Sequence, residues 1–175
     1  MLEALAGDDR VEELIGVARR PPARGYPRTR FVAADIVKED LVALLRGADV
    51  AIHLAWLIQP GRDETITRAV NVSGSQRVFE ATVQAGVPAL LYASSVGTYA
   101  PGPKDQFVDE SWPTTGISTS FYSHHKAAVE RLLDRLEREQ PALRVVRMRP
   151  ALIFKRGDAT EVRRLFTGCC SRECW

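Results

Sequence analysis

Short apolar runs alternate along this chain with longer segments in which apolar residues recur at helical spacing. The short runs predict β-strands at residues 12–18, 30–34, 49–56, 87–95 and 143–150. The longer segments predict helices at residues 38–47, 69–85 and 121–139. Strands that alternate with helices favour a parallel sheet joined by right-handed crossovers, so the chain is predicted to have an α/β fold.

Several residues mark the expected ends of these elements. Asp40 and Gly47 suit the start and end of the first predicted helix, and Gly86 suits the end of the second. Pro141 is expected to stop the third helix. The run at residues 49–56 (DVAIHLAW) is almost unbroken, which is typical of a strand covered on both faces. It is therefore the expected core strand.

Composition is that of a globular protein. The 175 residues suit one domain, and hydrophobic and charged residues make up 45% and 26% of them. The net charge is +2 and the arginines are scattered, so no basic stripe favours nucleic acid as a partner. No apolar run approaches the roughly 20 residues needed to cross a membrane, and the acidic start MLEALAGDDR is unlike a signal peptide. A cytoplasmic location is expected.

The three cysteines all lie in the final stretch CCSRECW. Cys169, Cys170 and Cys174 leave no pair that could join distant parts of a core, which excludes a disulfide scaffold. Three thiols without a neighbouring His do not favour zinc, so no metal is expected. Residues 157–175 are interpreted as an atypical tail and not as a domain.

The clearest candidate for chemistry is Tyr122-Ser-His-His-Lys126, at the start of the last predicted helix. Residues four apart on a helix project from the same face, so a phenol and an ammonium can share one site. A phenol titrates near pH ~10, and a neighbouring positive charge favours its ionised form. Ser95, at the end of the preceding strand, could hydrogen-bond a substrate oxygen. The alternative is a solvated Tyr–Lys pair on a helix surface.

Over roughly residues 2–156 the chain resembles the extended short-chain dehydrogenase/reductases of the NAD-dependent epimerase/dehydratase type. The matching stretches occur in the family's order and are FVAADI, DVAIHLAW, NVSGSQRVFEAT, LLYASSVGTYA, YSHHK and MRPALIF. The resemblance implies a partial NAD(P)-binding Rossmann-like domain over residues 1–156. It also implies that Tyr122 is the catalytic acid/base and that Lys126 holds the nicotinamide ribose and lowers the phenol pKa. Ser95 would bind the reacting oxygen.

The resemblance implies further cofactor contacts. Asp35 and Ile36 would meet the adenine, and Leu54 and Ala55 would lie at a strand end beside the cofactor. The remaining expected contacts are Ser94, Asn71 and the nicotinamide-flanking segment with Pro150, Ala151 and Ile153. For Asn71, capping a local turn is an open alternative.

Two arginines bear on the choice of nucleotide. Many NAD enzymes place an acid at the end of the second strand, whereas this chain has Arg19 and Arg20 there, which suit a 2′-phosphate better. NADP is therefore mildly favoured over NAD, the alternative being that both arginines are solvated. His53 is interpreted as a hydrogen-bonded core residue, and His124 and His125 as exposed helix positions.

One part of the resembled family has no counterpart here. The twelve glycines include no Gly-x-Gly and no Gly-x-x-Gly, and the opening LEALAGDDR has the pattern of the end of a first helix. We therefore interpret the chain as truncated at both ends and lacking the first strand and its glycine-rich turn. In the strand order 3-2-1-4-5-6 this strand lies mid-sheet, so its absence would expose two strand edges.

Three functions are consistent with these patterns. The first is an NAD(P)-dependent oxidoreductase or epimerase/dehydratase, with a nucleotide sugar as one expected substrate and a homodimer expected by analogy. The second is a non-catalytic fragment or interaction protein. The third is a dinucleotide-binding regulator, which would not need Ser95, Tyr122 and Lys126.

Overall fold

The computed structural model describes residues 1–58 and 64–153. Its strands are β1 (Leu14–Ala18), β2 (Thr29–Ala33), β3 (Ala51–His53), β4 (Ala89–Ala93) and β5 (Arg144–Met148). Its helices are α1 (Leu2–Ala6), α2 (Leu41–Leu45), α3 (Glu64–Arg68), the π-helix η1 (Ala69–Ser73), α4 (Gly74–Gln84), the 3₁₀-helix η2 (Val96–Thr98) and α5 (Phe121–Glu139). The predicted α/β alternation is confirmed. The tail at 157–175, with its three cysteines, lies outside the described residues.

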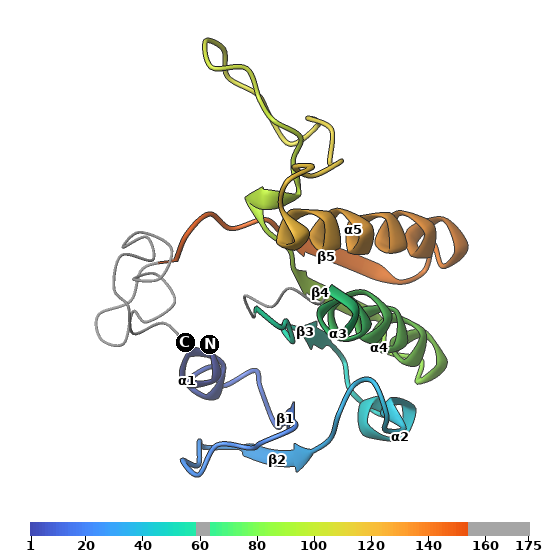
Figure 1. Cartoon of the computed structure of the whole chain (residues 1–175). Coiled ribbons are helices and arrows are strands. Elements are labelled where there is room, and N and C mark those ends of the chain that lie inside the picture. Colours follow the sequence, from blue (N-terminus) through green and yellow to red (C-terminus); the bar gives the residue numbers. More distant parts are fainter. Residues whose placement is uncertain (59–63, 154–175) are drawn as a thin grey trace, which may run out of the picture.

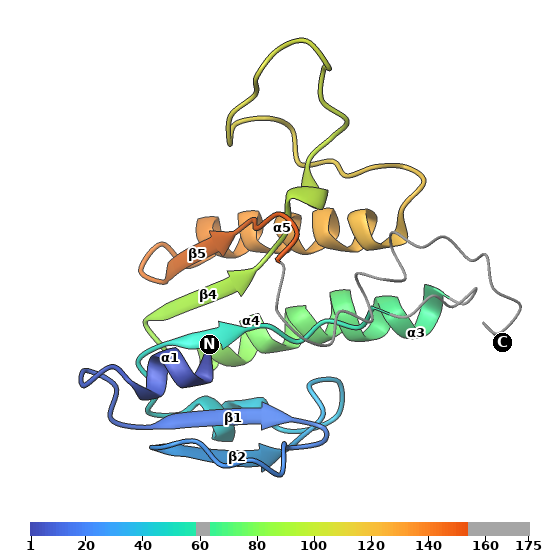
Figure 2. The ribbon, with the colours of Figure 1, turned by 90° about the vertical axis from the view of Figure 1, so that its left-hand side faces the viewer.

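All strand pairs in the described residues are parallel, and they form two sheets, β1-β2 and β3-β4-β5 (Figure 2). The division falls between β1 and β3, where the sequence predicted a missing strand. In the smaller sheet Gly16 pairs with Phe31, and a Cβ on Gly16 would lie 2.5 Å from the Phe31 ring. The Phe31 ring therefore occupies the space that a side chain at position 16 would take, and any residue other than glycine there would have to displace it.

The predicted helix ends are confirmed. Asp40 caps α2 by accepting a hydrogen bond from the Val42 amide at 2.9 Å. Gly47 and Gly86 follow their helices with φ of +81° and +72°, the left-handed region that glycine adopts without strain. The long helix α5 covers Phe121–Glu139, the range that its periodicity predicted.

Two elements differ from the predictions around residues 49–85. The expected strand at 49–56 is paired only over Ala51–His53, because beyond it the Leu57 amide and carbonyl bond the side chain of Asn71 and not a neighbouring strand. The expected helix at 69–85 is preceded by α3, and its first five residues form the π-helix η1 (Ala69–Ser73). Short π-helical segments of this kind are rare and often occur at functional sites.

The main core lies between β3-β4-β5 and the helices α4 and α5, which cover one face of that sheet (Figure 1). His53 is buried within it, as predicted, stacked on Tyr92 at 5.7 Å and 2.8 Å from the Ser75 hydroxyl through Nε2. The Ser75 hydroxyl donates to the Asn71 carbonyl, so the Nε2 of His53 must carry the hydrogen. Burial, with a smaller contribution from the charge of Lys126, lowers the pKa of His53 to about 4.

A buried carboxylate joins α5 to β4 and β5. Glu130 is fully buried and accepts hydrogen bonds from Ser94 at 2.6 Å, Arg147 at 2.9 Å and Arg149 at 3.0 Å. Burial alone would raise the pKa of this carboxyl, but the hydrogen bonds from Arg149, Ser94 and Arg147 outweigh it and lower the pKa. Arg149 also donates to the Tyr99 hydroxyl at 2.8 Å. The network therefore ties the end of β4 to the loop that follows it.

The prediction for His125 was wrong. His124 is exposed as expected, but His125 is 2% exposed and its Nε2 lies 2.9 Å from a carboxylate oxygen of Glu64. Glu64 opens α3, which lies 61 residues away in the chain. Helical spacing within α5 could not reveal this partner.

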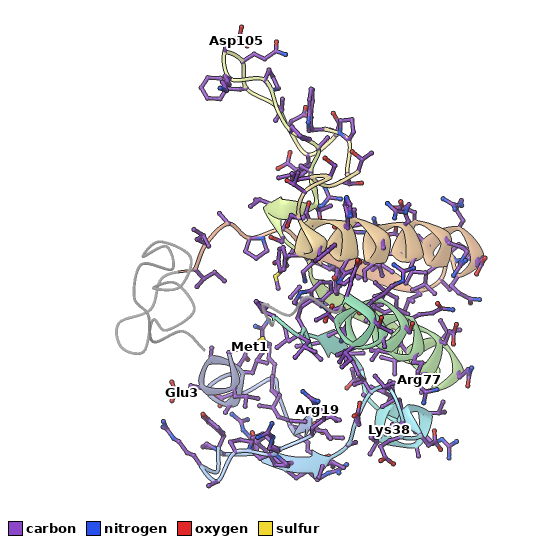
Figure 3. All side chains as sticks on the ribbon, in the orientation of Figure 1. Met1, Glu3, Arg19, Lys38, Arg77 and Asp105 are labelled. Atoms are coloured by element: carbon purple, nitrogen blue, oxygen red, sulfur yellow. The ribbon has the colours of Figure 1, made fainter. Side chains whose placement is uncertain are left out.

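The segment between η2 and α5 projects away from the sheets, with Asp105 near its tip (Figures 1 and 3).

None of the helices in residues 1–58 and 64–153 is long and apolar enough to cross a membrane. In the same residues, no three His, Cys, Asp or Glu side chains gather into a group that could hold a metal ion.

Candidate active site

The end of β4 and the start of α5 meet at one place. Ser120 caps α5 by accepting the Ser123 amide at 3.3 Å. The Ser123 hydroxyl in turn donates to the Gly97 carbonyl in η2 at 2.5 Å and accepts the Ile117 amide at 2.6 Å. These contacts fix the first turn of α5 against η2, and so bring Tyr122 and Lys126 close to the residues that follow β4.

Lys126 is 3% exposed, although it carries an ammonium. Its Nζ donates to the Ala93 carbonyl at 2.7 Å and to the Tyr92 hydroxyl at 3.3 Å. It also lies 3.7 Å from the centre of the Trp56 ring. Burial lowers the pKa of Lys126 to about 8, although the nearby charge of Glu130 acts in the opposite direction. The ammonium is thus charged near neutral pH but close to its titration point.

Tyr122 and Ser95 meet across Gly97. A Cβ on Gly97 would lie 3.2 Å from a ring carbon of Tyr122 and 3.4 Å from the Ser95 hydroxyl oxygen. The Ser95 oxygen accepts the Gly97 amide at 3.1 Å, and its own hydrogen has no acceptor among the described residues. The Tyr122 ring centre lies 5.8 Å from the Lys126 nitrogen. The three predicted catalytic residues are therefore neighbours.

Within the described residues the Tyr122 hydroxyl has no hydrogen-bond partner, and the residue is 37% exposed. Its ring packs edge-on against Trp56, with centroids 5.9 Å apart. The neighbouring Tyr92 is 1% exposed, and burial, with the charges of Glu130 and Tyr122, raises its pKa above the ordinary phenol value. Tyr122 is thus the phenol of the pair that solvent and a substrate can reach.

Two predicted cofactor residues use their side chains inside the protein. Ser94 donates to Glu130 and lies 3.2 Å from the Thr98 hydroxyl. Asn71 is 1% exposed, and its amide accepts the Leu57 N–H at 2.7 Å and donates to the Leu57 carbonyl at 3.0 Å. These bonds join Asn71 to a residue 14 positions away in the chain, so they are not the capping of a local turn, and the cofactor contact of Asn71 stays a prediction. The Asn71 side chain anchors the segment that carries Trp56.

Other predicted cofactor residues directly follow the strands β3 and β5, whereas Ser95, Tyr122 and Lys126 form what we call the catalytic group, a name for the prediction. Leu54 and Ala55 are exposed just beyond β3, and Pro150 accepts the Val96 amide at 3.1 Å. Ala151 and Ile153 are exposed beyond β5. These residues follow the carboxyl ends of parallel strands, where ligands bind in open α/β sheets.

The expected adenine residues are apart from this group. Arg19 is exposed beyond the end of β1 (Figure 3). Asp35 accepts the Val37 amide at 2.9 Å and is partly buried. The side chain of Ile36 packs against Gly74 of α4, where a Cβ would lie 2.8 Å from it. Arg19 and Asp35 therefore lie beyond the ends of β1 and β2, whereas Ile36 packs against the core of the larger sheet.

Sequence reasoning missed three residues that contact the predicted catalytic residues. Trp56 was absorbed into the predicted core strand, Tyr92 appeared as one apolar strand position, and Gly97 had no assigned role. The sequence indicates these contacts only weakly. Lys126 and Tyr92, for example, lie 34 positions apart in the chain. Alternation along β4 does indicate that Tyr92 shares a sheet face with Leu90 and Ser94, and the structure buries all three.

A comparison with known families matches residues 23–172 to the model of the 3-beta hydroxysteroid dehydrogenase/isomerase family. The chain is 29% identical over 153 residues to a 3-beta-hydroxysteroid dehydrogenase from Mycolicibacterium neoaurum, covering 83% of this chain and 42% of that protein. It is 32% identical over 111 residues to a sterol-4-alpha-carboxylate 3-dehydrogenase, decarboxylating, from Saccharomyces cerevisiae, covering 63% of this chain and 32% of that one.

Among solved structures, the chain resembles MoeE5 in complex with UDP-glucose and NAD. The identity is 31%, the TM-score is 0.61, and the match covers 78% of this chain and 45% of MoeE5. The chain thus spans less than half the length of each of these proteins. The relatives are dehydrogenases, and the solved neighbours include NAD-bound epimerases and dehydratases with the same α/β fold. Because the family match extends over most of its residues, this chain belongs to the 3-beta hydroxysteroid dehydrogenase/isomerase family.

Proposed function

We propose that this chain carries the catalytic group of an NAD(P)-linked oxidoreductase that interconverts a secondary alcohol and a ketone. The observation that supports the proposal most is the meeting of Ser95, Tyr122 and Lys126 at the end of β4, with Gly97 between the first two. Ser95 lies 27 positions before Tyr122 and 31 before Lys126 in the chain, and only the fold brings it to them.

Each of the two hydroxyl groups has a distinct task. The Ser95 oxygen accepts the Gly97 amide, and in the described part of the chain its hydrogen has no acceptor, so it can donate a hydrogen bond to the substrate oxygen. Tyr122 has an accessible hydroxyl, and its phenolic oxygen takes the proton of the alcohol during oxidation or returns it during reduction. The nicotinamide supplies the hydride acceptor or donor when it is bound.

Lys126 acts through its charge. Its ammonium lies on the same helix face as Tyr122, one turn away, and an adjacent positive charge stabilises a phenolate relative to a phenol. The ammonium is also anchored to the Ala93 carbonyl at the end of β4. We infer that the proton transfer at Tyr122 depends on Lys126 remaining protonated, and that it weakens as pH rises through the pKa of about 8.

The described residues fit the nicotinamide half of a dinucleotide better than its phosphates. Leu54 and Ala55 are exposed at the carboxyl edge of the larger sheet, where the nicotinamide would lie beside Pro150. For the phosphates, the sequence offers no Gly-x-Gly turn. At the adenine end we propose Asp35 and Ile36, with Arg19 favouring the 2′-phosphate of NADP, although NAD is the nucleotide bound in the similar structure.

Two substrate classes are compatible with this group. The family and its curated relatives favour a 3β-hydroxysteroid or related sterol. A nucleotide sugar, the substrate class expected from the sequence, is supported by the likeness to MoeE5, whose structure holds UDP-glucose. Both classes present a ring secondary alcohol to the same three residues. A homodimer and a cytoplasmic location remain predictions.

The test is a Tyr122→Phe substitution, assayed by following NADH or NADPH formation with a 3β-hydroxysteroid and with UDP-glucose. Loss of the proton acceptor is expected to lower turnover at least ~10²-fold. Tyr26→Phe serves as the control, because Tyr26 lies before β2 and packs on Phe31, outside the catalytic group. Full turnover by the Tyr122 variant would refute the assigned role.

A titration of the purified chain with NADH and NADPH separates the proposal from its alternatives. Micromolar binding together with turnover that depends on Tyr122 supports the enzyme. Binding without turnover of either substrate class would favour the dinucleotide-binding regulator. A chain that binds neither nucleotide behaves as a non-catalytic fragment.

A further inference from the structure

Trp56 lies in the centre of the catalytic group although no sequence motif points to it. The centre of its ring is 3.7 Å from the Lys126 ammonium, and its ring meets that of Tyr122 at an interplanar angle of 75°. The indole thus contacts both the group that supplies the positive charge and the phenol that the charge acts on.

Hydrogen bonds hold the backbone next to Trp56, whereas the indole nitrogen of Trp56 makes none within the described residues. The Asn71 amide makes two hydrogen bonds to Leu57, the next residue, and so anchors the segment to η1. The Nε1 of Trp56 is buried and has no hydrogen-bond partner among the described residues. A buried unpaired N–H is unfavourable, so the contacts of the ring must account for its position.

The groups around the Lys126 nitrogen come from four elements or segments. The Ala93 carbonyl and Tyr92 hydroxyl of β4 accept two of its three hydrogens, and His53 of β3 is neutral near pH 7. From α5, Glu130 contributes a negative charge that is shared with two arginines, and Tyr122 contributes its ring. The Trp56 face is the remaining close neighbour, and it attracts a cation strongly where water is excluded.

We propose that Trp56 is a positioning residue whose indole face holds the Lys126 ammonium against the Ala93 carbonyl, one helical turn from Tyr122. The indole does not touch the reacting atoms, and its effect on catalysis passes through the charge of Lys126. The catalytic consequence rests on the function proposed above, whereas the contact between the indole and the ammonium does not.

Fluorinated tryptophan tests the contact because fluorine weakens the negative face of the ring with little change in shape. In a chain carrying Trp112→Phe and Trp175→Phe, 5-fluoro- and 5,6,7-trifluorotryptophan enter at Trp56 alone. The titration of Lys126 is then followed by NMR of its Cε–Nζ group, assigned with Lys126→Arg. We expect the pKa of Lys126 to fall with each step, by about one pH unit for the trifluoro ring. An unchanged or raised pKa would overturn the proposal.

The matched control places the same labels at Trp112, in a chain carrying Trp56→Phe and Trp175→Phe. The indole of Trp112 donates to the Ala100 carbonyl, outside the Lys126 contacts, so its fluorination should leave the pKa of Lys126 unchanged. A response here as large as that at Trp56 would show a general effect of the label and would also overturn the proposal.

Activity separates this inference from the proposed function. If the pKa of Lys126 responds to the Trp56 ring but the chain neither binds nucleotide nor turns over an alcohol, the positioning role stands and the proposed function fails. If the pKa does not respond while turnover depends on Tyr122, the proposed function stands and the role of Trp56 fails. If both hold, the upper limb of the pH–rate profile should move down with the pKa of Lys126.

Discussion

The two sheets of this molecule are stabilised differently. In the larger one, Leu90 of β4 and Val129 and Leu133 of α5 are fully shielded from solvent, whereas no residue of β1 or β2 is buried. Close packing against neighbours on all sides resists displacement, while a half-exposed sheet opens more readily. The candidate catalytic residues Ser95, Tyr122 and Lys126 all belong to the well-packed part.

The same contrast appears in the ion pairs. Glu130 is enclosed by two arginines and a serine hydroxyl at the end of β4. In the smaller sheet, Glu13 and Arg30 form an ion pair at 2.6 Å in which both side chains are 56% exposed. A buried carboxylate with all its hydrogen bonds made defines a single arrangement, whereas solvent competes with an exposed pair.

Because of this difference in packing, we expect the two regions to respond differently when a nucleotide binds. The nicotinamide end would meet side chains that are already held in place, including Tyr122 and Lys126. The adenine end would meet Arg19 and Asp35, which lie beyond strands that bury little. We therefore expect the catalytic residues to be ordered before a nucleotide binds, and the adenine residues to be ordered by it.

The strongest test of the contrast is Glu130→Gln. The substitution leaves Arg147 and Arg149 facing a neutral amide in a buried site, and removing one partner of such a network typically costs about 3–5 kcal/mol. We expect a loss near the lower end of this range, because Arg147 keeps ion pairs with Asp134 and Glu137. The free energy of unfolding in urea measures the effect. The control Glu13→Gln should change stability by less than ~0.5 kcal/mol, and equal losses would remove the contrast.

The second prediction is that low pH destabilises the core of the larger sheet through His53. His53 has a pKa of about 4 in the folded chain and ~6.5 when unfolded, so below pH 6.5 the unfolded chain binds more protons. Its contribution is thus present above pH 6.5 and is lost as pH falls toward 4, by roughly 2 kcal/mol between pH 7 and pH 5.

Urea unfolding at pH 7 and pH 5 measures this loss. The His53→Gln variant should lose about 2 kcal/mol less than the natural chain over this interval, because glutamine can donate to Ser75 but does not titrate. His124→Gln provides the comparison at an exposed position and should retain the full loss. If both variants retain the full loss of stability between pH 7 and pH 5, the buried imidazole of His53 is not the source of that loss.

The sequence predictions are confirmed where the interactions join residues that are close together in the chain. The left-handed Gly47 just after α2, the cap at Asp40 and the full extent of α5 depend on residues within a few positions, and all three are confirmed. The parallel α/β fold is also confirmed, because alternation of strands and helices is visible in the pattern of apolar residues.

The side-chain environment of the site could not be predicted in the same way. The buried His125 contacts Glu64, 61 positions away in α3, and Ser94 donates to Glu130, 36 positions away. Trp56 lies over Lys126 because the sheet ends at His53 and Asn71 redirects the chain. Each of these contacts depends on how elements pack, which periodicity does not encode. The roles of the catalytic residues remain predictions that the substitutions above test.

The smallest expected effect concerns the link between the two regions. Arg77 of α4 donates to the carbonyls of Ile36 at 2.9 Å and Glu39 at 2.7 Å, close to Lys38 (Figure 3). Arg77→Met keeps most of the aliphatic stem but removes both hydrogen bonds. Because these bonds are exposed, we expect a cost of about 1 kcal/mol.

The loss should be local if the smaller region opens separately. In Arg77→Met, hydrogen exchange should accelerate at the amides of Lys38 and Glu39, which bond the Asp35 carbonyl, and stay unchanged across β4 and β5. Arg135→Met on α5 is the control, since within residues 1–58 and 64–153 its ion pair is with Glu139 of the same helix, at 4.0 Å. Equal acceleration in both regions would mean that they open together, and the difference in their packing would then have no dynamic consequence.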